Sequence, residues 1–301
     1  MHKINYSSNN EKIQALYQEL FSQDTYDFLA LIIAIVGMLG VINNLLVMII
    51  FYKFKRLRTP KDLFFFNVSF SDLFVSISGL VFTFSSCVTR KWTWYTKGCV
   101  FEGFITNLFG IVSILTLTCV AYERYIRVLH AKVIDFSWSW RSISFIWLYS
   151  FAWAAAPILG WNRYLLEIHG ISCSMDWTSN DPNDTFFILF YFLACIVVPV
   201  GFMFFCYGRI LHGIRKLSRV QNLQDIQKVK IMETEIKIGK IFLLMICTLL
   251  ICWIPRSVIS LLLTYGYKKQ ITTTTALIPT FLAKSSAAYN PVINIFMLKK
   301  V

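Results

Sequence analysis

The chain has 301 residues, of which 56% are hydrophobic, 17% aromatic and only 15% charged. A soluble domain has about 25% charged residues, so this composition argues against a single large water-soluble core. The net charge of +13 would suit a nucleic-acid partner only if the basic residues were clustered on a soluble face, whereas they lie in alternate gaps between apolar runs. The sequence therefore predicts an all-α membrane protein that binds lipid and no nucleic acid.

Seven apolar runs are long enough to cross a hydrocarbon core, which takes roughly 20 residues of helix. We expect these spans at 28–52, 62–88, 99–127, 141–161, 186–212, 236–264 and 273–297. The chain then divides into an amino-terminal segment (1–27), a seven-transmembrane helix bundle (28–298) and the start of a tail (299–301). Four prolines inside the spans are candidates for helix kinks, although bundles also tolerate such prolines without a hinge: Pro157, Pro199, Pro255 and Pro291.

The basic residues predict the orientation of the bundle. Most of the 29 Lys and Arg residues lie in the gaps after spans one, three and five and in the tail, and such gaps face the cytoplasm. We therefore expect a multi-pass protein of the cell membrane with an extracellular amino terminus and a cytoplasmic tail. Two Asn-x-Ser/Thr patterns, at Asn5 and Asn183, fall on the outer side and are candidate glycosylation sites.

Four ionisable residues lie deep within spans, where charge is costly and function is the first hypothesis: Asp72, Glu102, Arg256 and Lys284. Lys284 is in the middle of span seven, too far from either end to reach the membrane surface easily. A neutral lysine amine is the nucleophile that forms a Schiff base with an aldehyde. The alternative is a structural ion pair between Lys284 and either Asp72 or Glu102.

The outer side carries two further carboxylate and cysteine signals. Glu102 follows Cys99 by three residues, near the outer end of span three, and is a candidate counterion for a protonated Schiff base. Glu167, in the second outer loop, is an alternative counterion or an ordinary solvated acid. Cys99 and Cys173 both face the oxidising side, where a disulfide would hold that loop over the mouth of the bundle. No Cys or His spacing predicts a metal site.

A charged triplet, Glu123-Arg124-Tyr125, marks the inner end of span three, and Glu235 begins span six on the same side. A pair of Arg124 with Glu123 or Glu235 would hold the cytoplasmic ends of the helices together, and its rupture would open a cleft for a partner. The alternative is an ordinary boundary charge pair.

These residues belong to a series of landmarks in which the chain resembles the rhodopsin-like G-protein-coupled receptors over nearly its whole length. In chain order they are Asn44 with Val47, Asp72-Leu73, Glu123-Arg124-Tyr125, Trp147, Pro199 with Tyr207, Cys252-Trp253-Ile254-Pro255 and Asn290-Pro291. Within that family, a lysine six residues before the Asn-Pro of span seven is the retinal-binding signature of opsins, and Lys284 has that spacing. Three longer stretches, 52–60, 121–128 and 159–164, resemble the encephalopsin group of non-visual opsins.

The resemblance implies a sensor of blue to green light with the rhodopsin-like fold. Lys284 would carry 11-cis-retinal as a Schiff base, which light converts to the all-trans form, with Glu102 as counterion and Glu167 as the alternative. Trp253 would abut retinal, Gly110 would leave it room, and Cys99 and Cys173 match the family disulfide. The cytoplasmic partner would be a heterotrimeric G protein of the inhibitory type, with arrestin and receptor kinase as further candidates. The residues of this chain that would switch the G protein on are Glu123, Arg124, Tyr125, Glu235, Tyr207, Asn290 and Pro291.

Two positions depart from the family pattern. Asn294 replaces the tyrosine that ends the span-seven motif, which puts the efficiency of activation in doubt. Arg256, directly after Pro255, stands where opsins commonly have an uncharged residue. We expect its guanidinium to oppose a protonated Schiff base, and so to favour an ultraviolet-absorbing pigment or weaken retinal binding, unless it turns toward Glu102, Glu167 or the outer water.

The sequence is also compatible with other functions. The same fold could respond to a diffusible ligand without light or be constitutively active, as Arg256 and Asn294 would permit. A proton pump or transporter could use Asp72, Glu102 and Lys284 as a relay. An enzyme is not expected, because the sequence has no Ser/His/Asp set, metal cluster or phosphate-binding loop.

Overall fold

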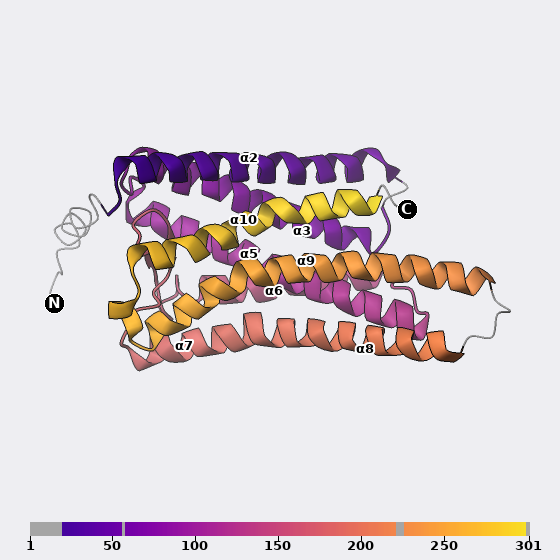
Figure 1. The fold of residues 1–301 in the computed structure, drawn as a ribbon. Helices are drawn as coiled ribbons and strands as arrows, with labels where there is room; N and C mark the ends of the chain where they lie inside the picture. Colours follow the sequence, from indigo (N-terminus) through magenta and orange to yellow (C-terminus); the bar gives the residue numbers. More distant parts are fainter. Residues whose placement is uncertain (1–19, 56–57, 221–225, 299–301) are drawn as a thin grey trace.

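The computed structural model describes residues 20–55, 58–220 and 226–298, and at 214–220, 226–242 and 291–298 it describes the backbone alone. The described chain is a bundle of helices that run side by side (Figure 1). The helical segments are α2 (Gln23–Lys53), α3 (Asp62–Ser78), η2 (Gly79–Phe84), α4 (Ser85–Val88), α5 (Tyr95–His130), α6 (Phe136–Ala155), α7 (Pro182–Phe192), η3 (Leu193–Val197), α8 (Val198–Val220), α9 (Ile226–Thr264), η4 (Tyr267–Gln270) and α10 (Thr273–Leu298). The expected all-α bundle is confirmed. Each of the seven expected spans corresponds to a helical stretch, with α3, η2 and α4 forming one stretch and α7, η3 and α8 another.

The helices at the outside of the bundle present apolar side chains outward. On α2, Phe28, Leu31 and Ile49 are each more than half exposed, as expected where the solvent is lipid rather than water. Within the described residues, five helical stretches are long and apolar enough to cross a membrane: Gln23–Lys53, Asp62–Val88, Tyr95–His130, Pro182–Gly213 and Leu243–Thr264. The amino end of α2 and the carboxyl end of α10 lie at opposite ends of the bundle (Figure 1).

Helix α5 runs through the middle of the bundle (Figure 1) and packs against α3, α6 and α8. Its buried face includes three charged side chains, Glu102 near one end and Glu123 and Arg124 near the other. Because α5 is 36 residues long, it reaches from one end of the bundle to the other and connects both groups of charged residues.

A short hairpin covers the end of the bundle at which α2 begins. Strand β1 (Tyr164–Leu166) pairs with β2 (Cys173–Met175) in antiparallel register, with Tyr164 opposite Met175. The expected disulfide joins Cys173 to Cys99 of α5, with 5.3 Å between their Cα atoms. The disulfide thus fixes the hairpin to the central helix.

The structure corrects the fourth span and adds two features that the sequence did not predict. Helix α6 ends at Ala155, so Pro157 follows the helix rather than kinking it. The chain leaves α6 through a turn in which Gly160 has φ of 100°, a conformation that a residue without a Cβ adopts freely. The π-helical segments η2 and η3 were not expected, and η3 ends two residues before Pro199, where the missing N–H of proline interrupts regular bonding.

The other two prolines lie in α9 and α10. Pro255 is inside α9, which visibly changes direction toward its carboxyl-terminal part (Figure 1), as the loss of a backbone donor would cause. Pro291 is among the positions where the structure describes the backbone alone.

Candidate functional site

Lys284 lies in the middle of α10 and points to a carboxylate of α5. Its Nζ is 2.7 Å from Oε1 of Glu102 and 2.6 Å from Oγ1 of Thr83. The lysine side chain is 18% exposed and that of Glu102 is 0% exposed. Of the two partners expected for a structural ion pair, Lys284 has Glu102, whereas Asp72 binds Asn290 and Ser113 instead.

Glu102 is held from three elements besides its own helix. Oε1 accepts hydrogen bonds from Lys284 and, at 3.2 Å, from Thr83 of η2. Oε2 accepts the backbone N–H of Cys173 at 2.8 Å. A fully buried carboxylate is tolerated when its lone pairs are satisfied and a cation lies beside it. Both conditions are met here.

The second outer carboxylate, Glu167, is bound to Arg256. Nη2 of Arg256 is 2.7 Å from Oε1 of Glu167, and Nη1 is 3.2 Å from Oε2. Thr280 of α10 bonds both residues, and Nε2 of His169 lies 3.0 Å from Oε2 of Glu167. Burial raises the pKa of Glu167, but the charge of Arg256 and the contact with His169 outweigh it and hold that pKa well below 4.5.

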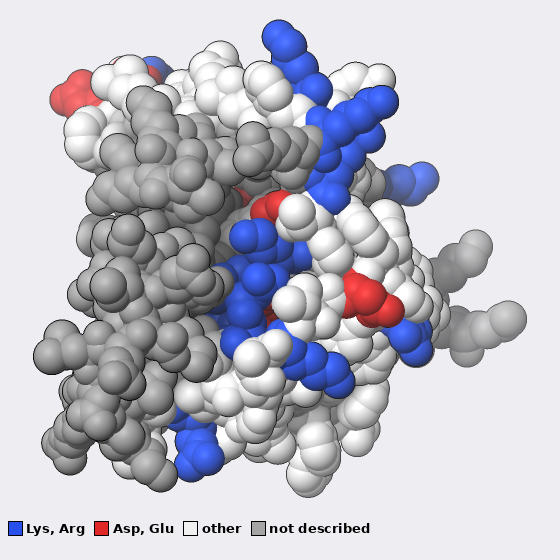
Figure 2. Space-filling model, turned by 90° about the vertical axis from the view of Figure 1, so that its right-hand side faces the viewer, with Lys and Arg blue, Asp and Glu red and all other residues white. Residues whose placement is uncertain are grey.

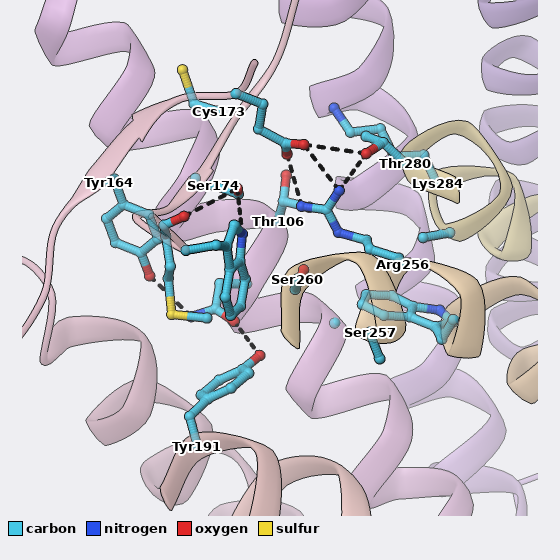
Figure 3. A pocket seen from close by; sticks show the side chains of 18 of the residues that line it. Thr106, Tyr164, Cys173, Ser174, Tyr191, Arg256, Ser257, Ser260, Thr280 and Lys284 are labelled. Carbon is cyan, nitrogen blue, oxygen red and sulfur yellow. Dashed lines mark hydrogen bonds and ion pairs between the residues drawn. The ribbon is translucent and has the colours of Figure 1, made fainter. Parts of the chain in front are cut away.

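The sequence predicted that Arg256 would oppose a protonated Schiff base unless it turned toward Glu102, Glu167 or the outer water. In the structure it turns toward Glu167. Its guanidinium is bound to a carboxylate and is therefore not an unpaired cation near Lys284 (Figure 3). Glu167 is correspondingly not an ordinary solvated acid, because its side chain is only 11% exposed.

A cavity of about 750 Å³, part of it open to solvent, lies between these groups. The hairpin covers it, and α5, α9 and α10 contribute its walls (Figure 3). Lys284 and Arg256 line one part, and aromatic side chains such as Tyr191, Trp177 and Trp253 line the rest. Such a mostly apolar space with a few convergent polar groups is typical of a small-molecule site.

Trp253 and Gly110 meet across the floor of the cavity. A Cβ at Gly110 would lie 3.0 Å from Cη2 of Trp253, so in this structure the glycine gives room to the indole. Nε1 of Trp253 donates to Oγ of Ser286 at 3.1 Å, which ties α9 to α10 beside Lys284.

Sequence reasoning missed three residues of this site. Thr83 is a hydroxyl within an apolar span and carried no signal, and Thr280 is one of several threonines at the start of span seven. His169 carried no signal in the sequence either, yet its side chain is fully buried against Glu167. Their contribution depends on contacts between segments far apart in the chain.

At the other end of the bundle, Glu123 holds two arginines. Its Oε2 is 2.7 Å from Nε of Arg124, and its Oε1 is 2.6 Å from Nε of Arg127. Of the two partners expected for Arg124, Glu123 is thus in contact. Tyr125 lies beside His130, and Tyr207 is buried on the neighbouring α8. The side chains of Glu235, Pro291 and Asn294 lie outside the described residues.

The surface of this end is basic. Figure 2 shows Lys and Arg side chains gathered around a hollow, with few Asp and Glu among the described residues. On the opposite end, Asn183 is exposed in the first turn of α7, where a glycan would have room. Asn5 lies outside the described residues.

Comparison with known proteins gives consistent matches. Residues 43–293 match the family described as 7 transmembrane receptor (rhodopsin family). The chain is 52% identical to Opsin-3 of Mus musculus over 281 residues, covering 93% of this chain and 70% of that protein. It is 31% identical to vertebrate ancient opsin of Salmo salar, covering 91% and 84%. The crystal structure of squid rhodopsin superimposes with a TM-score of 0.85 at 31% identity, covering 91% of this chain and 82% of that one.

Proposed function

Because this chain belongs to the rhodopsin-like seven-transmembrane receptors and, within them, to the opsins, we propose that Lys284 holds 11-cis-retinal as a Schiff base and that light then activates a heterotrimeric G protein. As a non-visual opsin the protein is a membrane receptor and not an enzyme.

One observation carries the proposal. The amine of Lys284 faces a largely apolar cavity with a fully buried carboxylate 2.7 Å away. An aldehyde on a long apolar chain needs this combination, because the amine forms the bond, the carboxylate balances the resulting charge and the aromatic walls take up the chain. The donor set therefore fits retinal.

Retinal, when bound, supplies a double bond that light isomerises. The other tasks fall to the protein. Glu102 keeps a proton on Nζ of Lys284, and the hairpin fixed by Cys99 and Cys173 keeps water from that proton. Trp253 lies between the cavity and the inner part of α9, so displacement of its indole would be transmitted to that helix.

The cytoplasmic half would convert this displacement into signalling. Release of Arg124 from Glu123, followed by an outward swing of α9 about Pro255, would open the basic end for a G protein. We propose the inhibitory class from the resemblance to the encephalopsin group, with arrestin and receptor kinase as later partners. The orientation that follows places the amino terminus and Asn183 outside the cell.

A light-independent receptor is the second candidate. It is favoured by the polar groups that share the cavity with Arg256, which are Asn107, Ser257, Ser260 and Thr280. Hydrogen-bonding groups of this kind suit a polar diffusible ligand as well as they suit water.

An absorption spectrum with and without 11-cis-retinal tests the proposal. We expect a retinal-dependent band in the purified protein, its loss in Lys284→Ala, and borohydride trapping of the ligand on Lys284. Lys268→Ala, in the outer loop, is the matched control and should keep the band. Absence of any retinal-dependent band would favour the light-independent receptor, and trapping on another lysine would overturn the assignment of Lys284.

A further inference from the structure

The two carboxylates of the outer site, Glu102 and Glu167, have different cations as partners. Glu102 has Lys284 as its cation, at 2.7 Å. Glu167 has Arg256, also at 2.7 Å, in a two-point contact. Glu167 lines the cavity that Lys284 also lines, so the question is what decides which carboxylate balances the charge on Lys284.

We propose that Arg256 is a positioning residue that occupies Glu167 and thereby leaves Glu102 as the carboxylate that holds the proton on Nζ of Lys284. This inference rests on the proposed function. It assigns a role to an arginine that departs from the family pattern and that no feature of the binding reaction requires.

The contacts of Glu167 support this assignment because they saturate the carboxylate. Arg256 approaches from α9, Thr280 from α10 and His169 from the same loop. The N–H of Ile171 points to Nδ1 of His169, so Nε2 is the nitrogen that carries the hydrogen toward Glu167. With these donors in place, neither oxygen of Glu167 is left without a partner.

Charge balance gives the same answer. At the outer site the two carboxylates each pair with a cation, Glu102 with Lys284 and Glu167 with Arg256. Removal of Arg256 would leave two carboxylates for one cation, and Glu167 could then balance the positive charge on Lys284. Removal of Glu167 would instead leave Arg256 unpaired, and its charge would oppose a proton on Nζ.

Absorption spectra of the full chain reconstituted with 11-cis-retinal at neutral pH test the inference, because a protonated linkage absorbs in the visible and a deprotonated one in the near ultraviolet. In Glu102→Gln the ratio of visible to ultraviolet absorbance should fall at least tenfold. Glu102→Gln/Arg256→Met should regain most of it, because Glu167 is released. The triple variant that adds Glu167→Gln should lose it again.

The matched control is Glu102→Gln/Arg256→Lys, which keeps a cation beside Glu167 and should resemble Glu102→Gln alone. The inference is overturned if Glu102→Gln and Glu102→Gln/Arg256→Met have the same spectrum, or if Glu102→Gln keeps a full visible band while Arg256 is intact. Failure of the wild-type protein to form any pigment would instead refute the proposed function, and the inference with it.

A second measurement uses the protein without retinal and does not depend on pigment formation. Glu167→Gln and Arg256→Met should each lower the temperature of unfolding, and the double variant should lose clearly less than the sum of the two. Additive losses would show that the two side chains do not act as a pair and would contradict the inference.

Discussion

The site depends on how individual charged side chains are paired within a low-dielectric bundle. Glu102 and Glu167 are both carboxylates of the outer half, yet each has its own cation. Removing one member of such a pair leaves a buried charge without compensation, which costs more than the pair itself contributes. Two predictions follow from the two pairs.

Lys284→Ala should destabilise the protein without retinal by about 3 kcal/mol, the low end for a broken buried pair. The loss is moderated because Thr83 and the N–H of Cys173 still bind Glu102. Thermal unfolding in detergent measures it. Lys284→Ala/Glu102→Gln should recover most of the stability, because no charge remains, and a double variant as unstable as Lys284→Ala would contradict this account.

Acid should weaken the contact between Glu167 and Arg256. The pKa of Glu167 is well below 4.5 in the folded protein and returns to its ordinary value on unfolding, so the unfolded chain takes up its proton at higher pH. The stabilisation is then complete above about pH 4.5 and is lost as pH falls through the lower, folded value. Between about pH 5 and pH 3 the unfolding temperature of Glu167→Gln should therefore fall less than that of the wild type.

Asp24→Asn is the control for the acid titration, because Asp24 is an exposed carboxyl in the first turn of α2. It should keep the wild-type dependence on pH. If Glu167→Gln follows the wild-type curve as well, the ion pair contributes nothing to acid sensitivity.

The close approach of helices α5 and α9 depends on Gly110. Gly110→Ala would place a Cβ 3.0 Å from Trp253, and the indole would have to shift. We expect a cost of about 1–3 kcal/mol from overpacking and a change in tryptophan fluorescence. Gly208→Ala, where a Cβ would meet nothing within 4 Å, should be neutral or stabilising because alanine favours helix. Equal effects of the two substitutions would contradict the prediction.

The helical elements could be predicted from the sequence because apolar runs of about 20 residues are typical of membrane-spanning helices. The fourth span was placed too late, since the apolar run continues past Ala155 through Pro157 to Trp161. The π-helical segments had no signal, because they depend on how neighbouring helices satisfy the backbone. The spacing to Asn290-Pro291 pointed to Lys284. Whether Arg256 contacts Glu102, Glu167 or water depends on the position of a loop 89 residues away in the chain, which the sequence alone does not predict.

Helix α5 connects the outer site to the charged residues at the inner end, and the two ends must change together if light is to be signalled. Glu123 binds both Arg124 and Arg127 within 2.7 Å. This contact holds the Arg124 side chain against its own helix and away from a G protein at the basic end of the bundle. Loss of the carboxylate should therefore favour the open form of the bundle.

Glu123→Gln should raise nucleotide exchange on the G protein in the dark, by about fivefold or more if the lost coupling is worth at least 1 kcal/mol. Exchange is measured with purified receptor and G protein. Arg141→Gln is the control, since Arg141 is exposed and bonds a backbone carbonyl of its own helix. Unchanged dark activity in Glu123→Gln would show that Glu123 does not restrain Arg124.

The bond from the N–H of Cys173 to Glu102 has a consequence for how this loop can evolve and be engineered. A main-chain donor is present whatever amino acid occupies the position, proline excepted. Related chains can therefore exchange the side chains at 172 and 174 and keep this contact to Glu102, whereas Cys173 is held by its disulfide to Cys99 and a one-residue insertion or deletion there would move the donor. Substitution scans of the loop should consequently understate its importance, and length variants should reveal it.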